Sequence, residues 1–284
     1  MPKIKIKNED LDNIRNLYLN GNSTVSISKV YDCSPTTILN HLLKMGIEIN
    51  RKQFIRKYSL NETYFDVVDT QNKAYILGFL YADGNVNLKK YTTSISLQEE
   101  DSYILEKMRI ELKSEKPLEY INYVNKDNFG YHYKNQYRLL FFSKYLCKSL
   151  INKGVMPNKS LKLKFPSFLN KSLIKHFIRG YFDGDGSFCF YNANNGHQNY
   201  TITFTSTQNF CEGLQNFIIN ELNIPCGNIY DASCHNGITK VLSFSGKNQT
   251  KTFLDWLYSD ADMYLKRKYN KYIKAFYLDN SKTE

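Results

Sequence analysis

Two aspartates, Asp83 and Asp185, end two copies of one short sequence pattern, one in each half of the chain. Each copy is an apolar, helix-like run that closes on Asp-Gly, over Ile76–Gly84 and Ile178–Gly186. A carboxylate at a helix C-terminus faces the negative end of the helix dipole, and two neighbouring carboxylates also repel each other. A divalent cation relieves both penalties. We therefore expect Asp83 and Asp185 to hold Mg²⁺ (or Mn²⁺), which would activate water and stabilise the leaving oxygen in phosphodiester hydrolysis.

Small residues four positions apart lie on one face of each motif helix, at Gly78 and Ala82 and again at Gly180 and Gly184. Small side chains let two helix backbones approach closely, so these residues predict a tightly packed helix pair. The glycine after each aspartate is expected to take the left-handed conformation that ends a helix. Asp-Gly is also an ordinary turn sequence. Two copies in matched contexts on a basic chain favour a symmetric metal site, which suits a two-stranded substrate.

The charge balance indicates an anionic partner. The 284 residues include 38 Lys and Arg against 27 Asp and Glu, which gives a net charge of +11. The 23 tyrosines beside so many lysines suit a surface that meets phosphates and bases. Biased coding alone also produces a chain rich in Lys, Asn and Tyr.

Several classes of protein do not fit the sequence. The six cysteines include no C-x-x-C pair and no zinc-finger spacing. The N-terminus lacks an apolar signal segment, and no stretch is long enough to span a bilayer. We expect a soluble intracellular protein without a membrane partner, cytoplasmic in a prokaryote or phage and organellar otherwise.

Residues 8–46 predict three short helices, followed by a basic tail. Asn8 is the expected cap of the first helix, and Ser34-Pro35 is a favourable opening for the third. The layout resembles a resolvase-type helix-turn-helix, which implies that outward side chains of the third helix read DNA. The expected contacts are Thr36, Thr37, Asn40, His41 and Lys44, then Arg51, Lys52, Arg56 and Lys57 in the tail. The alternative is a three-helix bundle for protein contact, and the basic tail favours DNA.

The same order of elements follows each motif. Period-two strands, such as 93–97 and 200–204, alternate with apolar helices, so each half reads helix, strands, helix, strands, helix. This order predicts an α+β fold with antiparallel sheets that helices cover on one face. We expect a helix-turn-helix domain at 1–57, a linker at 58–71, a first half at 72–166 and a second half at 167–284.

The two motifs resemble those of LAGLIDADG homing endonucleases in the single-chain form with two copies. Ala82-Asp83-Gly84 matches the end of the motif, and the run from Gly180 to Ser187 is a common form of the second copy. The resemblance covers about residues 72–280. It implies two pseudo-symmetric αββαββα halves, a saddle-shaped antiparallel sheet over double-stranded DNA, and cleavage of both strands across the minor groove with short 3′ overhangs. Asp83 and Asp185 would be the metal ligands, with the carbonyls of Ala82 and Gly184 as possible helpers.

The resemblance also implies residues around the metal. Gln98 ends a strand where the family often has a polar residue that orders water, and Thr205 is the expected match in the second half. For the basic residue near each scissile phosphate we predict Lys134 or Arg138 in the first half and Lys240 in the second. Asp183 is expected to serve helix packing or capping and not to bind metal.

Three functions remain open at this level. The first is a site-specific double-strand DNA endonuclease that acts in intron homing. The second is a non-catalytic transcriptional regulator on the same scaffold, which the presence of both aspartates disfavours. The third is a maturase that binds intron RNA, which no sequence feature separates from the first. An intein origin is disfavoured by the termini, and two motifs in one chain predict a monomer.

Overall fold

The computed structural model describes residues 6–49, 57–123, 134–157, 161–192, 197–232 and 239–278. The chain forms two compact units, Met1–Lys57 and Tyr58–Glu284. Each unit has its own hydrophobic core.

The first unit contains the three short helices predicted from the sequence. A 3₁₀ turn (η1, Asn8–Asp10) leads into α1 (Leu11–Leu19), followed by α2 (Thr24–Val30) and α3 (Pro35–Lys44). Serine side chains cap two of these helices by accepting hydrogen bonds from free backbone N–H groups. Ser23 accepts from Ser26 at the start of α2, and Ser34 accepts from Thr37 at the start of α3. Asn8 lies in the 3₁₀ turn and does not cap α1, because Asp10 holds that position. The core consists of Ile14, Ile27, Ile38 and Leu42.

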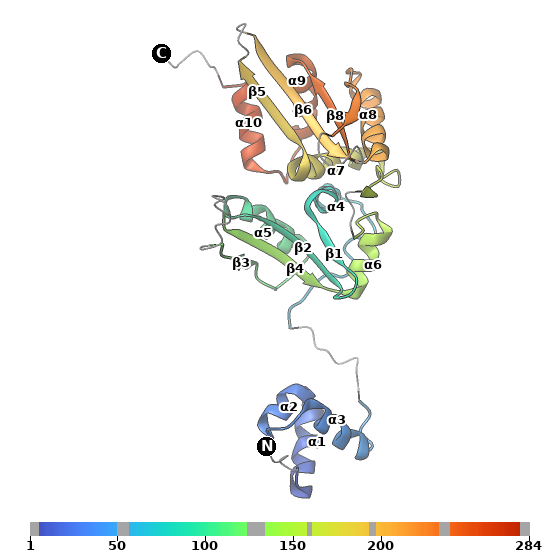
Figure 1. Ribbon diagram of the computed structural model, residues 1–284, viewed down its shortest axis with the longest axis vertical. Coiled ribbons are helices and arrows are strands. Elements are labelled where there is room, and N and C mark those ends of the chain that lie inside the picture. Colours follow the sequence, from blue (N-terminus) through green and yellow to red (C-terminus); the bar gives the residue numbers. More distant parts are fainter. Residues whose placement is uncertain are drawn as a thin grey trace. The chain divides into compact units, whose positions relative to one another are not determined.

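The second unit repeats one order of elements, αββαββα (Figure 1). The first copy comprises α4 (Gln71–Asp83), β1 (Asn85–Asn87), β2 (Thr92–Gln98), the 3₁₀ turn η2 (Glu99–Asp101), α5 (Ser102–Glu111), β3 (Glu119–Ile121), β4 (Gln136–Phe142) and α6 (Lys144–Asn152). The second comprises α7 (Lys171–Asp185), β5 (Ser187–Asn192), β6 (Gln198–Ser206), α8 (Gln208–Leu222), β7 (Ile229–Asp231), β8 (Lys240–Ser245) and α9 (Lys247–Tyr258), and ends with an added helix, α10 (Lys266–Phe276). The predicted fold class is confirmed.

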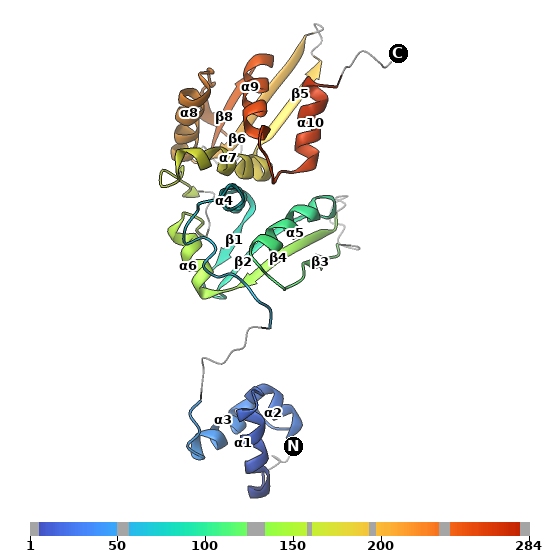
Figure 2. The same ribbon diagram turned by 180° about the vertical axis from the view of Figure 1, so that it is seen from behind.

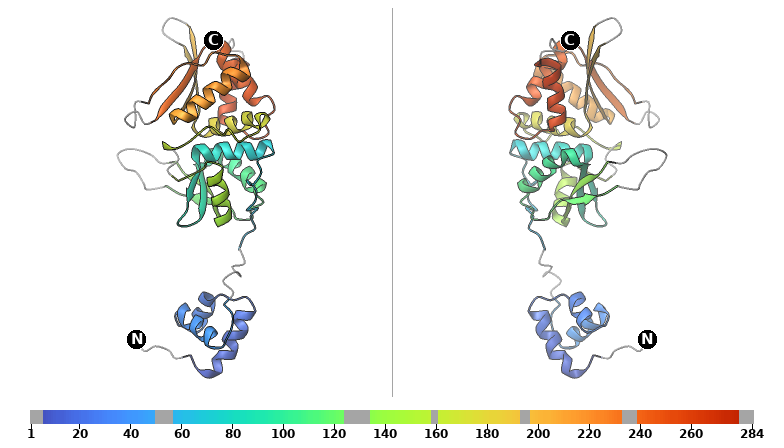
Figure 3. Two further views of the ribbon diagram at one scale, coloured as in Figure 1. Left: turned by 90° about the vertical axis from the view of Figure 1, so that its right-hand side faces the viewer. Right: turned by 90° about the vertical axis from the view of Figure 1, so that its left-hand side faces the viewer.

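Each half carries one four-stranded antiparallel sheet, in the order β1-β2-β4-β3 and β5-β6-β8-β7. Side chains alternate along the strands: in β2, Ile95 and Leu97 are buried, whereas Ser94 and Ser96 lie on the other face. Helices cover only one side of each sheet (Figures 2 and 3). Each sheet therefore keeps one open face, and that face carries mostly polar side chains.

The halves meet where α4 packs along α7, and glycine makes this approach possible (Figure 3). A Cβ on Gly78 would lie 2.0 Å from the carbonyl oxygen of Phe177, and a Cβ on Gly180 would lie 2.0 Å from that of Tyr75. A Cβ on Gly184 would lie 2.3 Å from the Cβ of Ala82. Gly78, Ala82, Gly180 and Gly184 therefore all lie where the two helices approach each other.

The segment 58–70 is part of the second unit and is not a free linker as expected. Tyr64 and Phe65 are buried in the core, and the backbone N–H of Asn61 donates to the carbonyl of Leu112. The Tyr64 hydroxyl also donates to Glu111, at 3.0 Å. The polar residues around the two aromatic side chains gave this stretch the appearance of a connector.

Replacing Gly78 or Gly180 with alanine tests the helix interface. In an ordinary helix this change stabilises by about 1 kcal/mol. Here we expect a loss of about 3 kcal/mol or more, because the new Cβ meets a backbone carbonyl that cannot move aside. Urea unfolding measures the difference. Lys148→Ala on the exposed face of α6 is the control and should change stability by less than about 0.5 kcal/mol. Wild-type stability of both glycine variants would contradict the close approach.

Candidate active site

The two motif carboxylates lie at the C-terminal ends of the paired helices. Asp83 is the last residue of α4, Asp185 is the last residue of α7, and both side chains are exposed. A Cβ on Gly184 would lie 3.2 Å from Oδ2 of Asp83, so the end of α7 abuts the Asp83 carboxylate. The helix pair therefore brings the two carboxylate-bearing ends together, as the repeat predicts.

The glycines after the carboxylates differ from expectation. Gly84 and Gly186 have φ of −68° and −74° with extended ψ, so neither adopts the left-handed conformation. Glycine is needed there for space instead. A Cβ on Gly84 would lie 2.5 Å from the carbonyl oxygen of Leu80, and one on Gly186 would lie 2.3 Å from the Phe182 ring.

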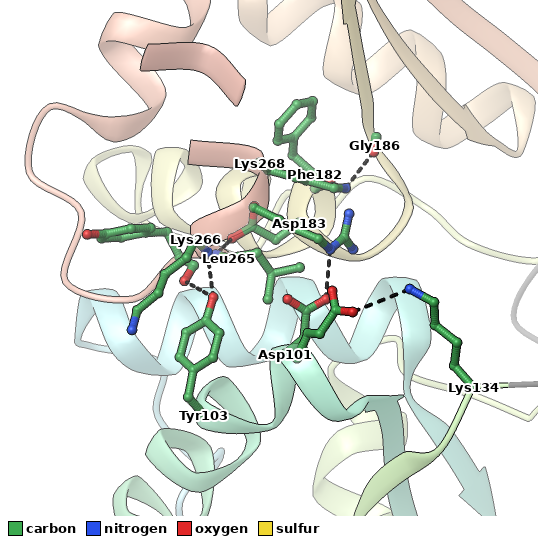
Figure 4. Close-up of polar contacts among 12 residues, drawn as sticks. Asp101, Tyr103, Lys134, Phe182, Asp183, Gly186, Leu265, Lys266 and Lys268 are labelled. Carbon is green, nitrogen blue, oxygen red and sulfur yellow. Dashed lines mark hydrogen bonds and ion pairs between the residues drawn. The ribbon is translucent and has the colours of Figure 1, made fainter. Parts of the chain in front are cut away.

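A lysine beside this site, Lys268 of α10, was not foreseen from the sequence. Its Nζ donates to the carbonyl oxygens of Phe182 and Gly186 at the end of α7 (Figure 4). Burial lowers its pKa to about 8, and the charges of Asp183, Asp83 and Asp185 oppose that shift. Lys268 therefore places a cation within the electrostatic reach of both motif carboxylates. Sequence reasoning missed it because several lysines cluster in α10 and only the fold separates them.

The donor set suits a hard divalent cation. Asp83 and Asp185 supply carboxylate oxygens, and the carbonyls of Ala82 and Gly184 belong to the last helical turns, where carbonyls lack intrahelical partners. Within the described residues, no group of three or more His, Cys, Asp and Glu could hold a metal. Two carboxylates with backbone and phosphate oxygens are a usual environment for Mg²⁺, so the residues present fit the predicted ion.

Gln98 is exposed at the end of β2, on the open face of the first sheet. Its expected match with Thr205 is wrong. Asn85, two residues after Asp83, is opposite Ser94, whereas Ser187, two residues after Asp185, is opposite Thr203. By this register Thr205 corresponds to Ser96. The counterpart of Gln98 is Thr207, which is buried and caps α8.

The basic residues predicted near the phosphates lie in different environments. Arg138 is on the open face, where its Nε donates to Oγ of Ser96 at 3.2 Å. Lys134 is exposed, with its Nζ 3.4 Å from Oε1 of Glu100. Lys240 is opposite the buried Ser206 and forms an ion pair with Asp231. Because strand side chains alternate, Lys240 lies on the helix-covered side, which favours a structural role.

The predicted DNA-reading residues of the first unit lie along α3. Thr36, Asn40 and Lys44 are exposed, whereas Thr37 and His41 are partly buried. The Thr37 hydroxyl also lies 2.8 Å from that of Ser34, so it belongs to the helix cap. Lys57 is exposed, and Arg51, Lys52 and Arg56 lie outside the described residues.

Asp183 is fully buried and has the packing role expected of it. It accepts hydrogen bonds from the hydroxyls of Tyr75 (2.8 Å) and Tyr258 (3.2 Å) and from the backbone N–H of Leu265 (2.8 Å). Its neighbour Arg179 is also fully buried and donates to the carbonyls of Met263 and Leu257. Burial raises the pKa of Asp183 to about 6, although the hydrogen bonds oppose that shift.

Comparisons with known proteins come from solved structures and one curated sequence; no protein-family model matches the chain. The I-LtrWI LAGLIDADG homing endonuclease bound to target DNA is 13% identical, with 76% of this chain and 90% of that chain covered and a TM-score of 0.48. The LAGLIDADG meganuclease I-AabMI bound to uncleaved DNA is 16% identical, with 71% of this chain and 88% of that chain covered and a TM-score of 0.46. Full-length DUF199/WhiA from Thermatoga maritima is 18% identical, with 75% of this chain and 63% of that chain covered and a TM-score of 0.45. Such low values carry no functional assignment.

The element order and the glycine-mediated helix pair decide the architecture. It is the pair of αββαββα halves that the resemblance to LAGLIDADG homing endonucleases implies. The curated relative is the DNA-directed RNA polymerase subunit Rpo1C of Methanocaldococcus jannaschii, 34% identical over 113 residues, or 40% of this chain. The match spans 12% of that protein's length. No helix among the described residues is long and apolar enough to cross a membrane.

The raised pKa of Asp183 predicts a pH dependence of stability. The folded chain holds the Asp183 proton to a pKa of about 6, against 3.8 for the ordinary carboxyl, so ionisation destabilises the fold as the pH rises through this window. Relative to Asp183→Asn, the wild type should lose up to about 3 kcal/mol of unfolding free energy between about pH 4 and pH 7. Urea unfolding at several pH values measures this.

The comparison of the two proteins isolates the aspartate. Burial lowers the pKa of His176 to about 4, and its protonation destabilises the fold as the pH falls. Both proteins contain His176, so its contribution cancels in the difference. Parallel pH profiles for wild type and variant would show that Asp183 does not have the raised pKa.

Proposed function

We propose that the chain is a site-specific double-strand DNA endonuclease that hydrolyses phosphodiester bonds with a divalent metal held by Asp83 and Asp185. The observation that carries the proposal is the pair of exposed carboxylates on the abutting ends of α4 and α7. A fold that needed only a rigid helix pair would gain nothing from two acidic groups at the negative ends of two helix dipoles.

The residues around the carboxylates have separable tasks. Bound Mg²⁺ would lower the pKa of water and stabilise the leaving oxygen. Asp83 and Asp185 would hold the ion, and the positive charge of Lys268 offsets the mutual repulsion of the two carboxylates from the buried side. The Gln98 amide, exposed at the end of β2, can orient a water molecule through its donor and acceptor. The two halves together offer one carboxylate to each strand of a duplex.

The open faces of the two sheets supply a surface for DNA. On the first sheet the strand alternation places amide and hydroxyl side chains beside Arg138; on the second it places mostly hydroxyl and tyrosine side chains. Such groups donate to and accept from base edges, and the net charge of +11 attracts the phosphate backbone. The first group includes Asn85, Ser94, Ser96, Gln98 and Gln136, and the second Tyr191, Thr201, Thr203, Thr205 and Ser243.

The first unit is proposed as a second DNA-reading element. Its α3 opens with the Ser34 cap and presents Thr36, Asn40 and Lys44 to solvent along one side. An asparagine amide pairs with adenine in the major groove, and a lysine suits phosphate. Two reading elements on one chain lengthen the recognised site.

Asparagine at either motif position tests the catalytic proposal. The target is first selected from plasmids with a randomised insert that the wild type linearises in Mg²⁺. Asp83→Asn and Asp185→Asn should each lower the cleavage rate by on the order of 10³-fold, because each removes one charged metal ligand. Both variants should still bind the target when binding is measured by gel shift in EDTA.

The matched control is Glu221→Gln, which removes a carboxylate from an ion pair with Lys171, at the opposite end of α7 from Asp185. It should cleave at the wild-type rate. Undiminished cleavage by both aspartate variants would overturn the proposed site. Sequence-specific DNA binding without cleavage by the wild type would favour a transcriptional regulator, and tighter binding of an intron transcript than of DNA would favour a maturase.

Substitutions on α3 test the role of the first unit. Asn40→Ala should lower the preference for one base pair by about 1–3 kcal/mol, because the amide no longer reads that base edge. Lys44→Ala should weaken binding to all sequences. It should also reduce the slope of log affinity against log salt concentration by about one, because one phosphate contact is lost. Binding to labelled target at several salt concentrations measures both. Arg15→Ala removes a charge from α1 of the same unit, and an effect equal to that of Lys44→Ala would indicate non-specific attraction.

A further inference from the structure

A short segment of the second half reaches across to the first half. We call residues 262–268, which connect α9 to α10 and begin α10, the strap. The side chain of Asn72 donates to Asp262 at 2.9 Å, and Lys107 donates to the Asp262 carbonyl at 3.1 Å. The Tyr103 hydroxyl donates to the carbonyl of Tyr264 and accepts from the backbone N–H of Lys266 (Figure 4). The strap therefore holds the start of α10 against the first half.

One charged pair in this segment involves a buried carboxylate. Nε of Arg267 donates to Oδ2 of Asp101 at 2.7 Å. The Asp101 side chain is 8% exposed, whereas that of Arg267 is 53% exposed. A charged partner stabilises a carboxylate removed from water, and this partner comes from the other half of the molecule. The position of Arg267 is consequently tied to the first half.

The pair lies between two parts of the proposed active site. Asp101 is three residues beyond Gln98, and the adjacent Glu100 contacts Lys134 (Figure 4). On the other side, Arg267 directly precedes Lys268, whose Nζ reaches the carbonyls at the end of α7, next to Asp185. A displacement of the first turn of α10 would move Lys268 away from that helix end.

We propose that Arg267 is a positioning residue. Through Asp101 it holds Lys268 at the end of α7, so that the surroundings of Asp185 depend on a contact with the first half. The inference rests on the proposed endonuclease function. Because the second half of the described chain adds α10 after α9, whereas the first half has a single helix after β4, this support acts on one half-site only. Its loss should slow cleavage of one strand more than the other.

The test removes the ion pair without leaving a buried charge. The double variant Asp101→Asn/Arg267→Gln has no charge at either position, so its fold should survive. On supercoiled target plasmid in Mg²⁺, it should accumulate nicked circles, because the second cut becomes about 10- to 100-fold slower. End-labelled target shows which strand is cut first. In most nicked molecules the cut should lie in that one strand, and the other strand should remain intact. Melting curves report the fold.

The control is Lys171→Gln/Glu221→Gln, which removes an ion pair between α7 and α8, within the second half. It should give the wild-type ratio of nicked to linear product. A second test variant, Arg267→Lys, retains the charge but shortens its reach, and should show an intermediate ratio if the first variant fails to fold.

The outcomes separate the two proposals. A wild type that binds but does not cut overturns the endonuclease proposal. A cutting wild type with an unchanged nicked-to-linear ratio in the folded double variant, or in Arg267→Lys if only that variant folds, overturns the role of Arg267. Equal slowing of both strands also overturns it, because a general structural role does not distinguish the half-sites.

Discussion

The rest of the second unit depends on the close approach of two helix backbones. Gly78 and Gly180 each face a carbonyl of the opposite helix at a distance that admits no side-chain carbon. This contact sets the separation of the helix ends, and hence that of Asp83 and Asp185. It also sets where the two sheets lie, because each sheet begins directly after its motif helix. Glycine lowers helix stability, so the sequence accepts a local cost to gain this geometry.

The two halves differ in the buried residues of their motif helices. In the second copy Arg179 and Asp183 are buried and hydrogen-bonded, whereas Leu77 and Tyr81 occupy the corresponding places in the first. Buried polar groups stabilise only when every partner is present, so they specify one arrangement of α7, α9 and the segment that leads to α10. In the first copy Leu77 is apolar, and the Tyr81 hydroxyl donates to the backbone carbonyl of Lys153 in the same half. Only the second copy therefore places charged residues at these two positions.

Sequence reasoning reached what depends on local pattern. The repeated glycines and aspartates predicted the helix pair and its carboxylates, since both follow from spacing along one element. The period-two strands predicted helix, strands, helix, strands, helix in each half, and the full αββαββα order came from the family resemblance. Lys268 and the pairing of Asp101 with Arg267 depend on contacts between residues far apart in sequence, which no periodicity reports. The match of Gln98 with Thr205 failed for a related reason. Apolar alternation determines which face a residue occupies, but a shift of two residues preserves the face and changes the partner.

The proposed substrate gives the asymmetry a physical meaning. A duplex presents two strands of opposite direction, and a symmetric helix pair presents one carboxylate to each. A specific target is rarely a perfect palindrome, so the two sheets can differ in the side chains that read it. On the first sheet Arg138 is opposite Ser96, and at the matching place on the second sheet Val241 is opposite Thr205. The charged residue of the first open face is therefore an apolar residue in the second. In the proposed function the halves read different sequences, so their surroundings at the carboxylates do not need to match, and a support such as α10 can serve one half alone.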